Sequence, residues 1–390
     1  MRKGLKSIKR TFKDMDKTLF FISLVLIIFG SLNIVTASSR EAVVNADANL
    51  YYYFFKHMII LFISLVGFII ILNIPTKDYP KLVPALYIVI FCLNAYLITK
   101  GSVTRGANNW IDLKVIKVQP SEFAKPVLIV ALSLMFQASY KSLMNPKVKH
   151  ANIIWKIIGF GLILPILVFL QKDLGTAIIL FGIFSVLFLF SPIQKNEKVK
   201  SIFISLIILL FLVMARKSLT GYVLSNTQMS RLNNFINPCS KYTETGYQVC
   251  NAFIAINSGG IGGVGLGKST QKYSYIPEPH TDMVFAIIAE ENGVIICSLI
   301  FMAYLAILWR ILKLSMKTKN LASKYICLGV ATYIFLHIFI NLGGLFGLIP
   351  LTGVPLPFLS YGGSFTLSLI ASLAVIQRIH IEMKNEKIKI

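Results

Sequence analysis

Long apolar runs alternate with short polar segments along almost the whole chain. A helix needs about 20 predominantly apolar residues to cross a bilayer, and about ten runs approach or exceed that length. They cover residues 18–37, 54–74, 81–98, 120–137, 152–170, 174–191, 200–216, 283–309, 323–345 and 359–379. The pattern predicts an all-α, polytopic membrane protein with one membrane domain over residues 1–390, flanked by basic tails at 1–17 and 380–390.

The longest polar connection, residues 217–282, lies between the seventh and eighth runs. Its glycine set at 259–267 predicts tight backbone turns. The fragment Gly267-Lys268-Ser269 lacks the strand and helix of a phosphate-binding loop, so nucleotide binding is not expected. Cys239 and Cys250 share this loop, and their spacing alone leaves a disulfide between them open.

Composition and charge narrow the class of protein. Only 14% of the 390 residues are charged and 56% are hydrophobic, whereas a soluble domain carries about 25% charge. The net charge of +23 comes from lysines and arginines in alternate short segments, which favours membrane topology over nucleic-acid binding. By the positive-inside rule, both termini are expected to be cytoplasmic, in a plasma membrane. The loop 99–119 is then extracellular although it holds four cations, which suggests an anionic ligand there.

Asp282 stands at the mouth of the apolar run 283–309, which also contains Glu290 and Glu291. Ionisable groups in a membrane cost about 2.5–3.5 kcal/mol on insertion scales, so they indicate a function. Asp282 could cap the helix that follows it, or act as a general base, and the residues alone leave both alternatives open. Because Glu290 and Glu291 are adjacent, we expect only one of them to face the bundle interior.

Glu122 and Lys125 lie three residues apart on a helix that Pro120 begins, so they share one face. They could be a pair that neutralises itself within the membrane. Alternatively they could line a polar cavity, with Lys125 facing an anionic substrate and Glu122 orienting it. Pro126 is expected to kink this helix.

The remaining candidates lie in turns. Asp173 suits a helix N-cap before the run 174–191, and Lys172 suits a contact with lipid headgroups. Arg105 could bind phosphate through its planar guanidinium, or belong with Trp110 to an interfacial anchor. Ser360 lies in a turn before the last run, where it could line a cavity or simply serve the turn.

The histidines and cysteines show no metal-ligand spacing. His280 could tune Asp282, but we expect it to face solvent. No cofactor is evident, and a divalent cation at an anionic substrate is left open.

Several sequence motifs follow one another along the chain, and their combination is specific. They are Gln119-Pro120-Ser121-Glu122-Phe123-Ala124-Lys125, Asp173-Leu174-Gly175-Thr176, Gly246-Tyr247-Gln248, Pro277-Glu278-Pro279-His280-Thr281-Asp282, Ala289-Glu290-Glu291 and Gly353-Val354-Pro355-Leu356-Pro357-Phe358-Leu359-Ser360-Tyr361-Gly362-Gly363. From the first run to the last, the chain resembles the SEDS family (shape, elongation, division and sporulation). Within it, Gln271-Lys272 and Tyr275-Ile276-Pro277-Glu278 favour the FtsW branch over the RodA branch.

The resemblance implies a ten-helix peptidoglycan glycosyltransferase. Such an enzyme polymerises lipid II, a disaccharide-peptide on undecaprenyl pyrophosphate, during cell division or cell-wall growth. It implies Asp282 as the catalytic base. It also implies a class B penicillin-binding protein transpeptidase as partner, with other divisome or elongasome membrane proteins. Two departures stand out: Asn109 replaces an expected arginine, and Lys172 an expected proline.

Two other functions fit the same pattern. A transporter or flippase of the lipid-linked precursor would also use polar groups and broken helices around a midplane cavity, although no inverted repeat is visible. A non-catalytic scaffold for a transpeptidase would leave Asp282, Glu122 and Lys125 without a role.

Overall fold

The computed structural model describes most of the chain. The residues it describes are 12–45, 49–104, 107–112, 117–145, 150–204, 214, 229, 232, 235–236, 239, 244–273, 276 and 279–388.

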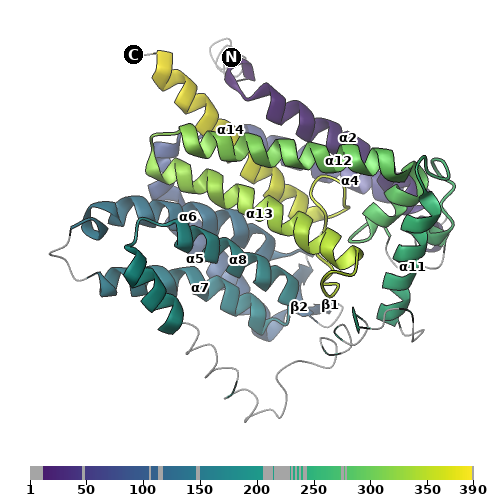
Figure 1. Cartoon of the computed structure of the whole chain (residues 1–390), viewed down its shortest axis with the longest axis horizontal. Helices are drawn as coiled ribbons and strands as arrows, with labels where there is room; N and C mark the ends of the chain where they lie inside the picture. Colours follow the sequence, from purple (N-terminus) through teal and green to yellow (C-terminus); the bar gives the residue numbers. More distant parts are fainter. Residues whose placement is uncertain are drawn as a thin grey trace.

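The structure is a bundle of long apolar helices (Figure 1). Its helices are α2 (Lys17–Ala37), α3 (Ser39–Asn45), α4 (Tyr52–Asn73), η1 (Thr76–Asp78), α5 (Tyr79–Lys100), α6 (Pro120–Leu143), α7 (Ala151–Leu170), α8 (Leu174–Phe190), α11 (Glu244–Gly259), η2 (Gln271–Tyr273), α12 (Val284–Lys317), α13 (Leu321–Leu345) and α14 (Gly363–Ile388). Eight of the described helices are long and apolar enough to cross a membrane, so the chain is a multi-pass membrane protein.

These eight helices match eight of the predicted runs. The run 174–191 forms α8, which is apolar but has 17 residues. Most of the run 200–216 lies outside the described residues. The last helix differs from the prediction, because α14 continues to Ile388 through most of the segment expected to be a tail.

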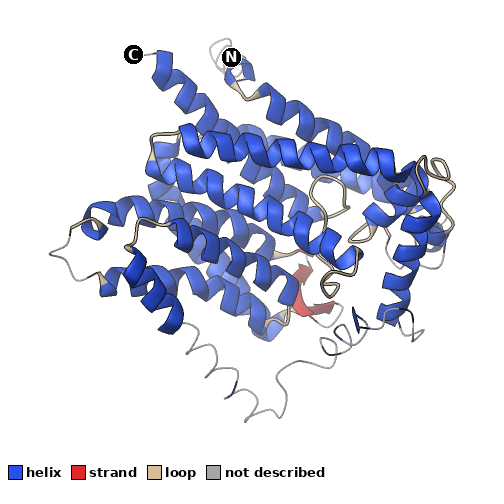
Figure 2. Ribbon diagram, in the orientation of Figure 1, coloured by secondary structure: helices blue, strands red, loops and turns tan. Residues whose placement is uncertain are grey.

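A small antiparallel sheet forms in the loop 99–119, where the sequence predicted no strands. Its strands are β1 (Ser102–Thr104), β2 (Ala107–Asp112) and β3 (Lys117–Val118), in the order β1-β2-β3. Val103 pairs with Asn108, and Ile111 pairs with Val118. Figure 2 shows the strands at the end of the bundle opposite the chain termini.

Both termini lie at one end of the bundle (Figure 1). A polar network joins three helices there. Asp16 caps α2 by accepting a hydrogen bond from Leu19 N, and its Oδ2 accepts one of 2.7 Å from Nη2 of Arg310 on α12. Its backbone N–H donates to Oε1 of Gln377 on α14 at 2.8 Å. These contacts hold the end of α12 opposite Asp282 against both terminal helices.

Helix α13 lies at the centre of the bundle. It packs against α6, α8, α12 and α14, and most of its side chains are buried, including Tyr333 and His337. Phe335 and Phe339 are the exposed aromatic side chains of this helix. A helix that is apolar and largely buried is typical of a membrane protein core. The few polar groups on α13 are therefore placed to join neighbouring elements.

Cys239 and Cys250 form a disulfide, with their Cα atoms 5.2 Å apart. The bridge joins Cys250 on α11 to the loop before it. The sequence left this pairing open, and the structure settles it.

Candidate active site

Asp282 lies in the turn that precedes α12. Its side chain is only 4% exposed, and Thr281 Oγ1 donates to Asp282 Oδ1 at 3.0 Å. Met283, not Asp282, precedes the first helical residue, and no side chain caps that end of α12. The capping alternative for Asp282 is therefore not what the structure shows.

Asn341 joins this turn to the segment between α13 and α14. Its Nδ2 donates to the carbonyl oxygens of Asp282 and Val354, both at 2.7 Å. Gly353 has a φ of 76°, and a Cβ placed on it would lie 3.5 Å from Asp282 Oδ2. The backbone at Gly353 thus lies against the carboxylate of Asp282.

Lys125 and Glu122 form a buried pair, as their spacing predicted. Lys125 Nζ lies 2.7 Å from Glu122 Oε1, and the two side chains are almost completely buried. The same Nζ lies 3.0 Å from His337 Nε2. Because His337 Nδ1 lies 3.0 Å from the carbonyl oxygen of Pro355, which can only accept, Nδ1 carries the ring proton and Nε2 accepts from Lys125.

His337 is the group that the sequence argument missed. Its signal was a lone histidine within the apolar run 323–345. Its ring stacks on Phe365 at 4.6 Å and meets Tyr333 edge-on at 4.9 Å. The Lys125 ammonium lies 5.8 Å from the centre of the Phe365 ring and 5.6 Å from that of Tyr333. Aromatic faces attract a cation at this range. The lysine is thus held by a carboxylate, an imidazole and two rings.

Asp173 caps α8, as predicted, by accepting a hydrogen bond of 3.1 Å from Thr176 N. Its other oxygen accepts from Asn109 Nδ2 at 2.7 Å and from Gln119 Nε2 at 2.9 Å. The asparagine that replaces the expected arginine therefore ties strand β2 to the start of α8. A Cβ on Gly175 would lie 3.0 Å from Val354 Cγ2, so the start of α8 also reaches the segment beside Asp282.

Lys172 is exposed and has a φ of 67°. A proline cannot adopt this conformation because its ring fixes φ near −65°. The turn before α8 is therefore built differently from one that carries the expected proline. Arg105 lies outside the described residues.

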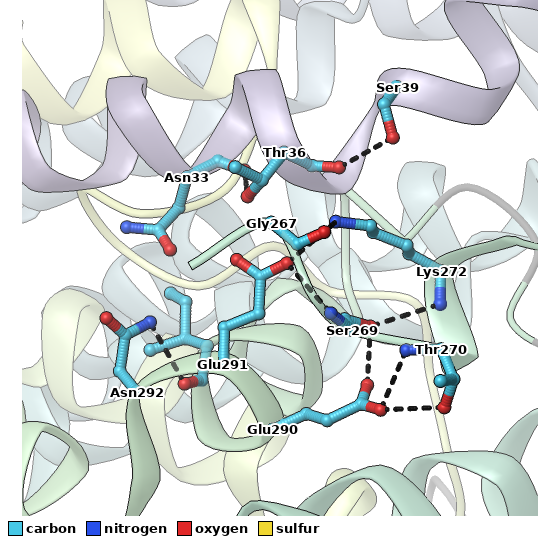
Figure 3. Close-up of polar contacts among 11 residues, drawn as sticks. Asn33, Thr36, Ser39, Gly267, Ser269, Thr270, Lys272, Glu290, Glu291 and Asn292 are labelled. Carbon is cyan, nitrogen blue, oxygen red and sulfur yellow. Dashed lines mark hydrogen bonds and ion pairs between the residues drawn. The ribbon is translucent and has the colours of Figure 1, made fainter. Parts of the chain in front are cut away.

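The expectation that only one of Glu290 and Glu291 faces inward is wrong, because both reach the segment 267–272 (Figure 3). Glu290 Oε1 accepts hydrogen bonds from the N–H and the hydroxyl of Thr270, both at 3.0 Å. Its Oε2 accepts a hydrogen bond from the Ser269 hydroxyl. Lys272 Nζ lies 2.9 Å from Glu291 Oε1. The segment wraps across the helix, so adjacent side chains can both bind it.

A break in α12 explains these contacts. Gly293 has non-helical angles, φ 73° and ψ −178°. The carbonyls of Glu290 and Glu291 accept from the N–H groups of Val264 and Gly265 at 2.9 and 3.0 Å.

On the other side of the break, two further N–H groups find partners. Val294 N donates to Gly260 O at 3.0 Å and Ile295 N to Ile261 O at 3.4 Å. The segment 259–267 therefore supplies the hydrogen bonds that the broken helix loses. Backbone N–H and C=O groups need such partners inside a membrane protein, where water is not there to bond them. A Cβ on Gly263 would lie 2.3 Å from Glu291 O, so this close approach needs glycine.

Ser360 closes a turn, since its Oγ accepts from Leu356 N at 2.7 Å. His280, expected to face solvent, is buried at 3% exposure, so that expectation is wrong. Its ring lies 4.6 Å from that of Tyr53 and 5.3 Å from that of Tyr361, and its carbonyl accepts from Tyr361 N at 2.9 Å. Burial is the main cause that raises the pKa of Tyr361 to about 12, and the nearby Tyr53 is a smaller one. Its phenol therefore stays protonated at neutral pH.

The structure thus brings Asp282, the Lys125–Glu122–His337 cluster and Asp173 around one segment, residues 352–357. Glu290 of α12 instead bonds Ser269 and Thr270 of the segment 267–272.

Known proteins resemble this chain in both sequence and fold. Residues 16–385 match the family model of the FtsW, RodA and SpoVE cell cycle proteins. The chain is 32% identical over 377 residues to the probable peptidoglycan glycosyltransferase FtsW of Francisella salina, covering 95% of this chain and 90% of that protein. It is 29% identical over 383 residues to the peptidoglycan glycosyltransferase MrdB of Escherichia coli K12, covering 96% and 97% of the two chains.

Two solved structures share the fold. One is a chain of a peptidoglycan synthase complex, with a TM-score of 0.72 and 23% identity over 94% of this chain and 97% of that one. The other is the rod shape determining protein RodA of Thermus thermophilus, with a TM-score of 0.66 and 21% identity over 94% and 96%. With its membrane bundle and ordered motifs matched over almost its full length, the chain belongs to the FtsW, RodA and SpoVE family of cell cycle proteins.

Proposed function

We propose that this chain is a peptidoglycan glycosyltransferase that polymerises lipid II, with Asp282 as its general base. The observation that carries the proposal is the placement of a nearly buried carboxylate at one end of a membrane bundle. Three elements hold its surroundings: the turn before α12, Asn341 of α13, and the segment at Gly353.

The reaction needs one proton acceptor. The 4-hydroxyl of the acceptor sugar attacks the anomeric carbon of the donor, a C–O bond forms, and the bond from that carbon to the pyrophosphate oxygen breaks with inversion. Asp282 takes the hydroxyl proton, and the undecaprenyl pyrophosphate leaves with the bonding electrons. A positioned general base contributes typically about 10²–10⁴-fold to such a step.

The Lys125–Glu122–His337 cluster positions the site. Within this cluster, His337 bonds the carbonyl oxygen of Pro355, and Asn341 bonds that of the adjacent Val354. Together these two bonds hold the segment that lies beside Asp282. In this geometry the Lys125 ammonium has two hydrogen-bond partners and one N–H group left. Its side chain is fully buried, so a contact with the donor pyrophosphate would require the surrounding side chains to open. Substrate contacts remain predictions for Lys125, Glu122, Arg105, Lys172, Asp173, Glu290 and Ser360.

Location and partners follow from the same proposal. The chemistry belongs at the extracellular face of a bacterial plasma membrane, where Asp282 and the strands would lie, and both termini would be cytoplasmic. The new glycan needs crosslinking, so we propose a class B penicillin-binding protein transpeptidase as partner. The fold shared with a chain of a peptidoglycan synthase complex supports this pairing.

Purified full-length protein in detergent, supplied with lipid II, tests the proposal directly. Glycan polymer on a gel supports it. Movement of intact lipid II across a vesicle membrane without polymer would favour a transporter instead. Parallel reactions with EDTA and with Mg²⁺ test the divalent cation that the sequence left open.

A further inference from the structure

The turn that carries Asp282 has a further support at His280, two residues earlier. The His280 side chain is buried, and its Nδ1 lies 3.3 Å from Glu41 Oε2. A carboxylate repels a bare nitrogen lone pair, so Nδ1 carries a proton in this contact. The separation is slightly longer than that of an N–H···O hydrogen bond, so the contact is mainly electrostatic. Because Glu41 belongs to α3, the contact ties the connection between α2 and α4 to the turn at Asp282.

Two tyrosine rings hold the imidazole of His280 in place. The ring of Tyr53, on α4, lies 4.6 Å from it, and the ring of Tyr361 lies 5.3 Å from it, both in tilted arrangements. These two contacts restrict where the imidazole can lie. The carboxylate of Glu41 then selects which ring nitrogen bears the proton. Position and proton of the imidazole are thus set by residues outside the turn itself.

Helix α3 makes a second contact with the chain that leads to Asp282. It packs against η2, which contains Lys272, and Lys272 Nζ is paired with Glu291 of α12 at 2.9 Å. Helix α3 therefore contacts the segment 271–280 at both of its ends, at η2 and at His280. A segment held at both ends has less freedom to shift than one held at a single end, so α3 braces the approach to Asp282.

The backbone of the turn carries this support to the carboxylate. Only Thr281 separates His280 from Asp282, and its Oγ1 donates to Asp282 Oδ1 at 3.0 Å. The carbonyl of His280 accepts from Tyr361 N at 2.9 Å, and the carbonyl of Asp282 accepts from Asn341 Nδ2 at 2.7 Å. Peptide units are planar, and consecutive Cα atoms stay about 3.8 Å apart. A shift of His280 therefore moves the carboxylate of Asp282 as well.

We propose that Glu41 is a positioning residue for polymerisation. Through His280 it holds the turn in the orientation in which the Asp282 carboxylate meets the acceptor hydroxyl, and Glu41 itself touches no reacting atom. The role rests on the proposed function of Asp282 as general base. Misplacing a reacting group by about 1 Å can cost on the order of 10²-fold in rate. Loss of the contact should therefore lower kcat and leave KM for lipid II nearly unchanged.

Steady-state polymerisation of lipid II by purified full-length protein tests this role. Glu41→Ala and His280→Phe should each lower kcat by about ten-fold and change KM by less than about two-fold. The phenylalanine keeps a ring between the tyrosines and removes Nδ1. The double variant should be no slower than either single variant, because both substitutions remove the same contact. Arg40→Ala, at the exposed neighbour of Glu41 on α3, is the matched control and should keep the wild-type kcat.

Melting temperatures, with kcat normalised to the folded monodisperse fraction, separate positioning from folding. A purely structural contact would lower the melting temperature and leave the normalised kcat unchanged. If Glu41→Ala does not fold, Glu41→Gln keeps the shape of the side chain without its charge and should show the same loss of kcat. A wild-type normalised kcat in the Glu41 variant would overturn the proposal. So would a double variant about a hundred-fold slower than the wild type, which is the product of two independent effects.

Asp282→Asn, assayed in parallel, distinguishes the two proposals. If Asp282→Asn polymerises at the wild-type rate, the general-base assignment fails and the role of Glu41 fails with it. If Asp282→Asn is inactive while Glu41→Ala keeps the wild-type kcat, the base assignment stands and only the positioning role of Glu41 is overturned.

Discussion

The Asn341 side chain donates a 2.7 Å hydrogen bond to the backbone carbonyl of Asp282 and an equal one to Val354. One turn earlier on α13, His337 bonds the carbonyl of Pro355 and the ammonium of Lys125. Two side chains of one buried helix thus connect the candidate base to the buried ion pair. The geometry at Asp282 therefore depends on α13, although α13 contributes no carboxylate.

Asp282→Asn should abolish glycan polymerisation while membrane insertion survives. The amide keeps the shape and the hydrogen bond to Thr281 but cannot take a proton, so the loss should be about 10²-fold or more. The measurement is polymer yield from lipid II. Asp112→Asn, at an exposed carboxylate of strand β2, is the control and should retain activity. Wild-type yield from Asp282→Asn would end the general-base assignment.

Asn341→Leu should slow polymerisation by about 10–100-fold, because a small displacement of a reacting group has effects of this size. The loss should appear in kcat more than in KM. Asn251→Leu is the matched control, since Asn251 is also buried but bonds Tyr247 O within its own helix. Equal effects of the two substitutions would show that Asn341 has no positioning role.

Lys125→Met should lower the free energy of unfolding by about 3–5 kcal/mol, because it leaves the Glu122 carboxylate buried without its cation. Adding Glu122→Gln should restore much of that stability. We expect the double variant to remain impaired in lipid II use. If activity returned together with stability, the pair would serve folding alone. Denaturant unfolding and polymer yield, measured on the same preparations, decide between these outcomes.

Gly293→Ala should destabilise the break in α12. A Cβ there would lie 2.4 Å from Gly263 N, and the φ of 73° disfavours any side chain. Strained backbone positions of this kind cost about 1–3 kcal/mol. Gly262→Ala is the control, because no atom lies within 4 Å of a Cβ at that position. A lower melting temperature in Gly293→Ala alone is the expected result, and equal melting temperatures would contradict it.

Reduction of the Cys239–Cys250 bridge should lower stability by about 3 kcal/mol in the chain-entropy model of a short loop. Alkylation without reductant, followed by mass spectrometry, should leave both cysteines unlabelled. Two labelled thiols in that peptide would contradict the bridge. The free thiol of Cys92, which is exposed, provides an internal control for labelling.

The sequence determined the bundle, because each membrane helix satisfies its own backbone hydrogen bonds and needs only a sufficiently long apolar run. It also determined local pairs: Glu122 with Lys125 at three residues apart, and Asp173 with the start of α8. The tertiary structure decided everything that joins distant segments. Only it brought His337 to Lys125, Asn341 to Asp282, and the glycines of 259–267 to the break at Gly293. It also buried His280 and directed both Glu290 and Glu291 to one segment. Such contacts depend on how helices pack, and packing partners cannot be read from the spacing of residues along one chain.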